Sequence, residues 1–158
     1  MLTFRALVVE DNKAVRSFVE RVLRDAGYDT RVAVDGVAAR DIVLQSGPPD
    51  IVVTDESMPR MSGHEFARWL RQRWPDVKIL FLSGYADPIY GDRNDLWENE
   101  GFLDKPCTVR GLLQAVSLLL FRKLDADPTR QARPSAAPVL CETPVPARPH
   151  RLYSPRDR

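Results

Sequence analysis

Five short apolar runs alternate with helix-like segments in this 158-residue chain, and polar side chains follow four of these runs. Glu10 and Asp11 follow the first run, Asp55 the third, Ser83 the fourth and Lys105 the fifth. If the runs are parallel strands, their carboxyl ends share one edge of a sheet, where ligands of such folds bind. We therefore expect three carboxylates, a hydroxyl and an ammonium group to converge at that edge.

This set of groups has the chemistry needed to receive a phosphoryl group. Three carboxylates at close range repel one another unless a cation lies among them, and Mg²⁺ favours carboxylate and phosphate oxygens. A carboxylate can also act as a nucleophile and form an aspartyl phosphate. Phosphoryl transfer then needs charge neutralisation at the equatorial oxygens. We expect Mg²⁺, Lys105 and the Ser83 hydroxyl to supply it, with Asp55 as the nucleophile.

Each of these residues also has an ordinary structural interpretation. A single aspartate after a strand is usually a turn or cap residue, and Glu10 and Asp11 could simply cap the helix that follows them. Ser83 could satisfy backbone groups at a strand end, and a Lys-Pro pair such as Lys105-Pro106 is common. Only their joint placement at four strand ends favours the functional interpretation. The two histidines have no metal-ligand neighbours in sequence, and we expect both at the surface.

Apolar periodicity predicts the elements that position the site. The predicted strands are 7–9, 30–34, 51–54, 77–82 and 102–103, and the predicted helices are 13–26, 37–45, 63–73 and a last one capped by Thr108, with a poor helix in 86–100. The first helix has Asn12 as its cap and one apolar face that includes Phe18. Alternating strands and helices with continuously apolar strands indicate a parallel sheet covered on both faces.

Charge and composition divide the chain into two parts. Residues 1–121 hold 15 Lys and Arg against 18 Asp and Glu, whereas residues 122–158 hold 8 against 4. An acidic body argues against direct DNA binding. Seven of the 13 prolines lie in 128–155, without glycine or apolar periodicity. We therefore predict a domain at 1–123 and a disordered Pro/Arg-rich tail at 124–158 with no output domain.

Four segments together resemble the receiver domain of two-component response regulators over about residues 4–121. They are Leu7 to Asn12, Thr54 to Pro59 with Ser62-Gly63, Leu82-Ser83-Gly84, and Lys105-Pro106. The stretch from Ser83 to Asp87 is most similar to receivers attached to hybrid histidine kinases. The resemblance implies an α/β, flavodoxin-like, doubly wound fold: a five-stranded parallel sheet in the order 2-1-3-4-5 with five helices, the fourth weak.

The resemblance also implies a role for each site residue. Asp55 resembles the phosphoacceptor, and Glu10 and Asp11 the Mg²⁺ pair, with Asp55 and the Ser57 backbone carbonyl as further ligands. Lys105 resembles the phosphate-pairing lysine and precedes a cis Lys105–Pro106 bond. Ser83 and Phe102 resemble the switch hydroxyl and the switch aromatic.

The implied function is a single-domain response regulator that is phosphorylated by a sensor histidine kinase or a phosphotransfer protein. It would signal through protein contacts, of which a phosphorylation-dependent homodimer is one form. The alternative is a phosphate sink or a kinase-modulating receiver without its own output. In either case the chain would catalyse only its own phosphorylation and dephosphorylation. The sequence has no signal peptide and no apolar run long enough to span a membrane, which predicts a cytoplasmic location.

Three other classes of protein fit the sequence less well. Aspartyl-phosphate hydrolases have an Asp-x-Asp motif after their first strand. Here Asp55 follows the third predicted strand, and the residue two positions later is Ser57 rather than an aspartate. A transcription factor would need a DNA-binding motif after Lys123, and the proline-rich tail contains no helix-turn-helix pattern. A nucleotide-binding protein would need a Gly-x-x-x-x-Gly-Lys loop, which the sequence lacks.

Deletion of residues 125–158 should leave both folding and phosphorylation intact, because the tail lacks the apolar periodicity needed to pack on the domain. Thermal denaturation and acetyl phosphate labelling of the truncated and full-length chains would check this. A large fall in melting temperature on truncation would show that the tail packs on the domain.

Overall fold

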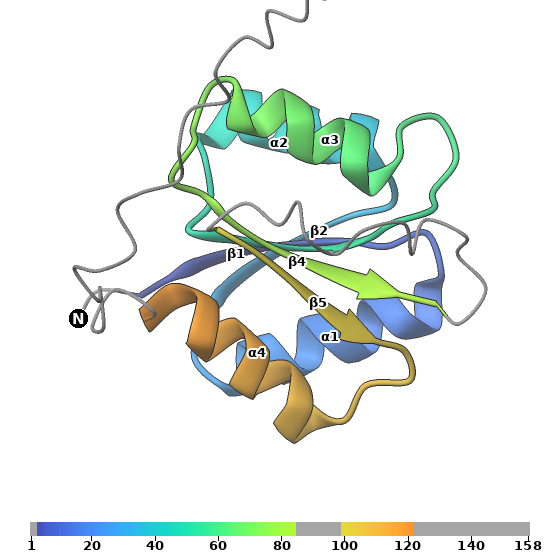
Figure 1. Ribbon diagram of the computed structural model, residues 1–158, viewed down its shortest axis with the longest axis vertical. Coiled ribbons are helices and arrows are strands. Elements are labelled where there is room, and N and C mark those ends of the chain that lie inside the picture. The colour runs from blue at the N-terminus through green and yellow to red at the C-terminus, as the bar shows by residue number, and fades with distance from the viewer. Residues whose placement is uncertain (1–2, 85–98, 122–158) are drawn as a thin grey trace, which may run out of the picture. The chain divides into compact units, whose positions relative to one another are not determined.

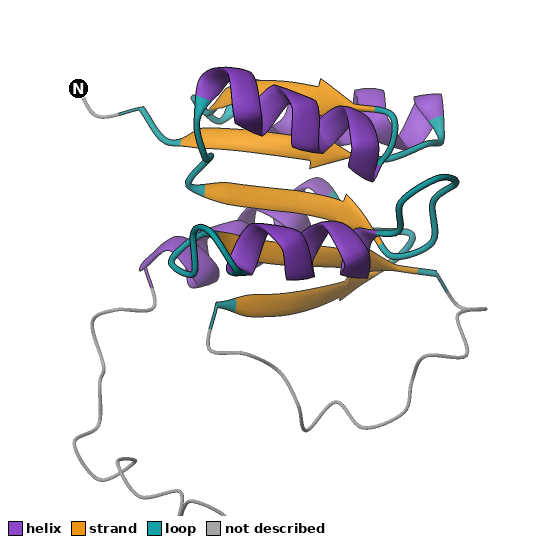
Figure 2. Cartoon of the chain, turned by 90° about the horizontal axis from the view of Figure 1, so that it is seen from above, coloured by secondary structure: helices purple, strands orange, loops and turns teal. Residues whose placement is uncertain are grey.

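The computed structural model describes residues 3–84 and 99–121, which form one α/β unit. Its five strands are all parallel and lie in the order β2-β1-β3-β4-β5. Figure 2 shows all five arrows pointing the same way, so their carboxyl ends share one edge of the sheet. The predicted fold class and strand order are confirmed. The predicted weak helix falls almost entirely, and the predicted tail falls wholly, outside the described residues.

The strand and helix bounds agree with the sequence pattern to within a few residues. The strands are β1 (Arg5–Val9), β2 (Asp29–Ala33), β3 (Ile51–Asp55), β4 (Lys78–Ser83) and β5 (Glu100–Asp104). The helices among the described residues are α1 (Lys13–Asp25), α2 (Gly36–Ser46), α3 (Gly63–Arg71) and α4 (Val109–Phe121). None of these helices combines the length and the apolarity needed to cross a bilayer.

Helices cover both faces of the sheet, which explains why its central strands are mostly apolar. Figure 1 shows α2 and α3 on one face and α1 and α4 on the other. Every residue of β3 is buried. One apolar core lies on each face: Phe66 and Phe81 belong to the core under α2 and α3, and Leu23 and Leu112 to the core under α1 and α4. Packing on both sides fixes the strand ends in place.

Local capping sets where α1 begins and ends. The Asn12 side chain accepts hydrogen bonds from the backbone N–H groups of Ala14 and Val15, at 2.9 and 3.2 Å. Gly27 follows the helix with φ of +90°, a left-handed conformation that glycine adopts without strain. The predicted cap is therefore confirmed. Phe18 was predicted on the buried face but is 37% exposed, because it lies at the margin of the apolar stripe.

Helix α3 is shorter than predicted. It begins with a capping box, in which Ser62 and Glu65 bond reciprocally to each other's backbone N–H groups. It ends at Arg71 rather than residue 73, because Pro75 disfavours helical backbone at the residue before it. Trp74 therefore lies in the following turn, and it packs with Trp69 against the core under α2 and α3.

Gly63 allows α3 to start directly against the end of β3. A Cβ atom at this position would lie 2.0 Å from the backbone oxygen of Asp55. No side chain fits at that distance, so the close approach of helix and strand requires glycine.

Gly63→Ala should therefore destabilise the fold by about 1–3 kcal/mol, because the added methyl group must displace backbone at the end of β3. Urea denaturation would measure the change. Gly84→Ala is a matched control, since a Cβ atom there meets no atom of the described residues within 4 Å. Equal stability of the two variants would contradict the packing constraint at Gly63.

Candidate functional site

Three carboxylates gather where β1 and β3 end. The two strands are neighbours, and Val9 pairs with Thr54, so Glu10 and Asp55 emerge side by side. Glu10, Asp11 and Asp55 can each offer one oxygen such that all three lie within 4.8 Å of one another. Glu10 is 1% and Asp55 8% exposed, whereas Asp11 is exposed to solvent. The convergence that the sequence predicted is confirmed for these residues.

Lys105 brings the positive charge into this cluster. Its Nζ atom lies 3.0 Å from Glu10 Oε2 and 3.0 Å from Asp55 Oδ1. Its backbone N–H donates to the Ser83 carbonyl at 2.7 Å, which ties the segment after β5 to the end of β4. The Lys105–Pro106 bond is cis, as the family resemblance implied. One ammonium group therefore bridges two carboxylates that come from different strands.

The local environment shifts the pKa values of both partners. Burial works against the charge of Lys105, but its hydrogen bonds to Glu10 and Asp55 prevail and raise its pKa above the usual value. Burial also works against the charge of Glu10 and raises its pKa, although the hydrogen bond from Lys105 opposes this change. Lys105 therefore remains an ammonium group at neutral pH and can pair with an incoming anion.

Backbone contacts hold the two buried carboxylates in place. Asp55 Oδ1 accepts from the Glu56 N–H at 2.9 Å, and Glu10 Oε1 accepts from the Asn12 N–H at 3.2 Å. The Arg16 guanidinium reaches back from α1 and donates to the Glu10 carbonyl at 2.7 Å and the Asp11 carbonyl at 3.2 Å. These bonds preorganise the site without a bound ligand.

The donor set fits a hard divalent cation. Glu10, Asp11 and Asp55 supply oxygens only, and a single lysine leaves the cluster with an excess of negative charge. Mg²⁺ prefers such oxygen ligands and retains several waters. Ser57 lies exposed in the loop after β3, two residues beyond Asp55. The assignment of its carbonyl to the metal remains a prediction.

Ser83 and Phe102 lie on the neighbouring strands. Leu82 pairs with Asp55, which places Ser83 one residue further along β4, where it is 3% exposed. The Phe102 ring on β5 stacks on Phe81 with a centroid distance of 5.1 Å. Ser83 thus lies on the strand next to Asp55, and Phe102 lies one strand further from the carboxylate cluster.

Sequence reasoning missed a contact between the buried Glu56, next to Asp55, and His64. Glu56 is 6% exposed, and its Oε1 atom lies 3.2 Å from His64 Nε2. The His64 ring also stacks on Phe81 at 4.6 Å. His64 was predicted at the surface; its side chain is 35% exposed, so it reaches solvent but is partly covered by these two contacts. No sequence spacing signals this contact, because it joins a loop residue to the first turn of a helix.

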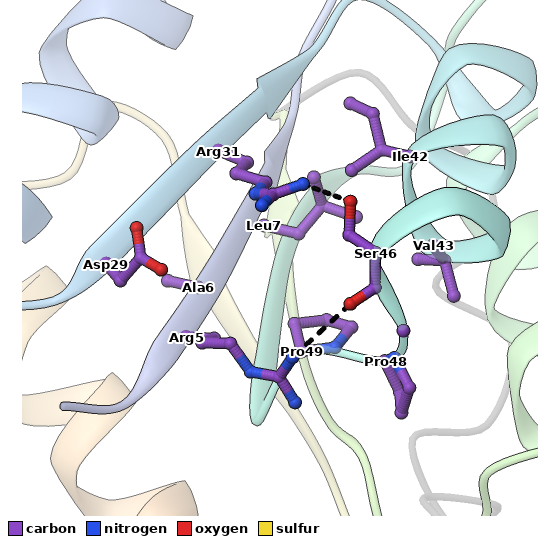
Figure 3. Close-up of a pocket in the computed structure, with 11 residues that line it drawn as sticks. Arg5, Ala6, Leu7, Asp29, Arg31, Ile42, Val43, Ser46, Pro48 and Pro49 are labelled. Carbon is purple, nitrogen blue, oxygen red and sulfur yellow. Dashed lines mark hydrogen bonds between the residues drawn. The ribbon is translucent and has the colours of Figure 1, made fainter. Parts of the chain in front are cut away.

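A separate pocket lies at the amino ends of β1 and β2, at the opposite edge of the sheet (Figure 3). It is a small hollow of about 30 Å³, and Arg5 and Arg31 reach across it to Ser46 at the end of α2. Cations at a helix carboxyl end satisfy its free carbonyls and favour its dipole. This pocket therefore has a structural explanation, and it contains none of the predicted site residues.

A family model described as the response regulator receiver domain matches residues 6–117. The chain belongs to the response regulator receiver domain family. The resemblance inferred from four sequence segments is thus confirmed.

The receiver matches three kinds of curated relative. It is 33% identical to the response regulator receiver protein CpdR of Brucella abortus, over 73% of this chain and 96% of CpdR. It is 39% identical to the sensor kinase CckA of the same organism, over 72% of this chain but only 12% of CckA. It is 36% identical to the response regulator MprA of Mycobacterium bovis, of which it spans about half, 54%.

Solved receiver structures have the same fold. The chemotaxis response regulator CheY4 of Vibrio cholerae has a TM-score of 0.67 and 29% identity, over 75% of this chain and 100% of CheY4. The receiver domain of the hybrid histidine kinase CckA has a TM-score of 0.61 and 32% identity, over 73% of this chain and 98% of that domain. Receivers of the family partner with histidine kinases or phosphotransfer proteins, and the kinase relative fits that pairing.

Mg²⁺ binding should depend on the acidic cluster. Asp11→Ala should weaken Mg²⁺ affinity by at least about tenfold, the lower range for loss of even an outer partner of a metal site. The metal-free variant should be no less stable than wild type, because one repulsive charge is removed. Calorimetric titration with Mg²⁺ would measure the affinity.

Asp25→Asn is the control for this titration, since Asp25 lies exposed on α1 in an ion pair with Arg21. Equal Mg²⁺ affinity of Asp11→Ala and Asp25→Asn would contradict the metal assignment.

Proposed function

We propose that this receiver is a response regulator that accepts a phosphoryl group on Asp55 from a sensor histidine kinase or a phosphotransfer protein. The observation that carries the proposal is the bridging position of Lys105, whose Nζ atom contacts both Glu10 and Asp55 at 3.0 Å. A cation held between two buried carboxylates can transfer its contact to a phosphoryl oxygen as soon as one arrives.

The proposed step is a displacement at phosphorus. A carboxylate oxygen of Asp55 attacks the phosphorus of a phosphohistidine, and the new P–O bond forms as the P–N bond breaks. The electron pair of that bond stays on the imidazole nitrogen, which takes up a proton. Lys105 then pairs with one phosphoryl oxygen and the Ser83 hydroxyl donates to another.

Mg²⁺ held by Glu10, Asp11, Asp55 and the Ser57 carbonyl would neutralise charge on a phosphoryl oxygen during this step. Loss of the phosphoryl group by hydrolysis regenerates the carboxylate. The chain would thus catalyse only its own phosphorylation and dephosphorylation, and we do not propose turnover of an external substrate.

The proposed output is a phosphorylation-dependent protein contact. Phosphorylation adds about −2 of charge beside Lys105 and draws the Ser83 hydroxyl toward the phosphate. The space left beside β4 allows Phe102 to turn inward from its stack on Phe81. The resulting change in the surface of β5 and α4 would be recognised by a protein partner or a second copy of the chain. A phosphate sink or a kinase-modulating receiver is the alternative.

Two comparisons support the single-domain form of this proposal. The match spans 96% of CpdR and 100% of CheY4, so proteins that consist almost entirely of the matched receiver region occur. A cytoplasmic location is part of the proposal, because the chain would encounter the phosphohistidine of a sensor kinase or phosphotransfer protein there.

Incubation with Mg²⁺ and acetyl phosphate should add one phosphate to the full chain, and Asp55→Asn should abolish the adduct because it removes the nucleophile. Intact-mass analysis would detect it. Asp25→Asn, an exposed acid on α1, should be labelled like wild type. An undiminished adduct in Asp55→Asn would overturn the assignment of the phosphoacceptor.

A further inference from the structure

The loop between β3 and α3, residues 56–62, carries the predicted metal ligand Ser57 and is closed at its base. The Gly63 N–H donates to the Glu56 carbonyl at 3.1 Å. At the tip, the Met61 N–H donates to the Pro59 carbonyl at 2.8 Å. These bonds shape the loop but do not by themselves fix its position against the rest of the domain.

The tip of this loop is fixed to the start of α2 by two contacts. The Gly36 N–H donates to the Met61 carbonyl at 3.3 Å, and the Arg60 guanidinium pairs with the Asp35 carboxylate. A Cβ atom at Gly36 would lie 2.6 Å from Met61 Cγ, so the packing is close as well as polar.

Asp35 uses its two oxygens for different purposes. Oδ1 accepts from the Ala38 N–H at 2.9 Å and caps α2, whereas Oδ2 is the atom that pairs with Arg60. The carboxylate is 2% exposed. Burial opposes its charge, but the Ala38 N–H and the Arg60 guanidinium together hold the pKa of Asp35 below its usual value. Capping alone needs only one oxygen, so it does not account for the pair with Arg60.

Arg60 is also held in an unfavourable backbone conformation. Its φ of +69° lies in the left-handed region, and Arg60 is the one residue other than glycine with positive φ among residues 3–84 and 99–121. Such a conformation persists only where surrounding contacts hold it. The Arg60 side chain is 61% exposed, so packing of this side chain contributes little to holding its backbone conformation. The bond from the Met61 N–H to the Pro59 carbonyl closes this turn around Arg60, and the ion pair is the side-chain contact that joins it to the start of α2.

We propose that Arg60 is a positioning residue for the Mg²⁺ site: its pair with Asp35 holds loop 56–62 so that the Ser57 carbonyl faces the carboxylate cluster. The pair thereby also keeps the Glu56 N–H on Asp55 Oδ1. This inference rests on the proposed function, because it assigns Mg²⁺ to the cluster. We call the pair of Arg60 and Asp35 the loop latch.

Arg60→Gly tests the loop latch without backbone strain, because glycine adopts positive φ freely while the guanidinium is removed. Asp35→Asn is the complementary variant, since asparagine caps a helix as well as aspartate does but lacks the charge. Each should weaken Mg²⁺ affinity by about tenfold, measured by calorimetry on the full chain. The double variant should be no weaker than either single one, because both remove the same contact.

Two further measurements separate positioning from a general loss of structure. In the metal-free protein, amide exchange at Ser57 and Met61 should be faster in Arg60→Gly than in wild type, while exchange in α1 and α4 should be unchanged. At saturating Mg²⁺, the acetyl phosphate labelling rate of Arg60→Gly should return to that of wild type. A combined Arg21→Ala and Asp25→Asn variant, which removes an exposed ion pair on α1, should change none of these values.

Wild-type Mg²⁺ affinity in Arg60→Gly would overturn the loop latch. So would a double variant whose Mg²⁺ affinity falls by the product of the two single fold-changes. These outcomes are distinct from failure of the proposed function. If wild type took up no phosphate at Asp55, the phosphoacceptor proposal would fail, and the affinity and exchange comparisons would still decide the loop latch.

Discussion

Repulsion among three carboxylates is the constraint on which the rest of the structure depends. Two unit charges 4.8 Å apart repel by about 3 kcal/mol at an effective dielectric constant of about 20. Lys105 contacts Glu10 and Asp55 at 3.0 Å and offsets part of this repulsion. It supplies one positive charge against three negative ones, so the cluster retains affinity for a further cation. The lysine and that cation then both become available to a phosphoryl group, which is why the arrangement suits a phosphoacceptor.

The fold maintains this unfavourable cluster because the strands and helices that carry its residues are tightly packed. Strands β1 and β3 are central and buried, so Glu10 and Asp55 have no freedom to move apart. The glycine at residue 63 lets α3 begin directly against Asp55, and Arg16 holds the carbonyls of Glu10 and Asp11 from the side of α1. Repulsion at the site is thereby balanced by apolar burial elsewhere, as is common for functional sites.

The sequence predicted those parts of the molecule that depend on local pattern. Strand ends follow from apolar runs, and the caps at Asn12 and Thr108 follow from side chains that bond within three residues. Strand order came from the family resemblance. Contacts between distant segments were not predictable: the pair of Arg60 and Asp35 joins residues 25 positions apart, and it depends on a positive φ that no arginine signals. The contact of His64 with Glu56 was missed because it depends on how the loop after β3 turns back to the first turn of α3.

The central claim is that a phosphoryl group at Asp55 acts on the strands beside it. Amide hydrogen exchange of the full chain, with and without Mg²⁺ and the phosphoryl mimic beryllofluoride, tests this most directly. The account predicts slower exchange near Asp55 together with altered exchange in β5 and α4, both absent in Asp55→Asn. A change confined to the neighbourhood of Asp55, with none in residues 100–121, would contradict the switch and favour a phosphate sink.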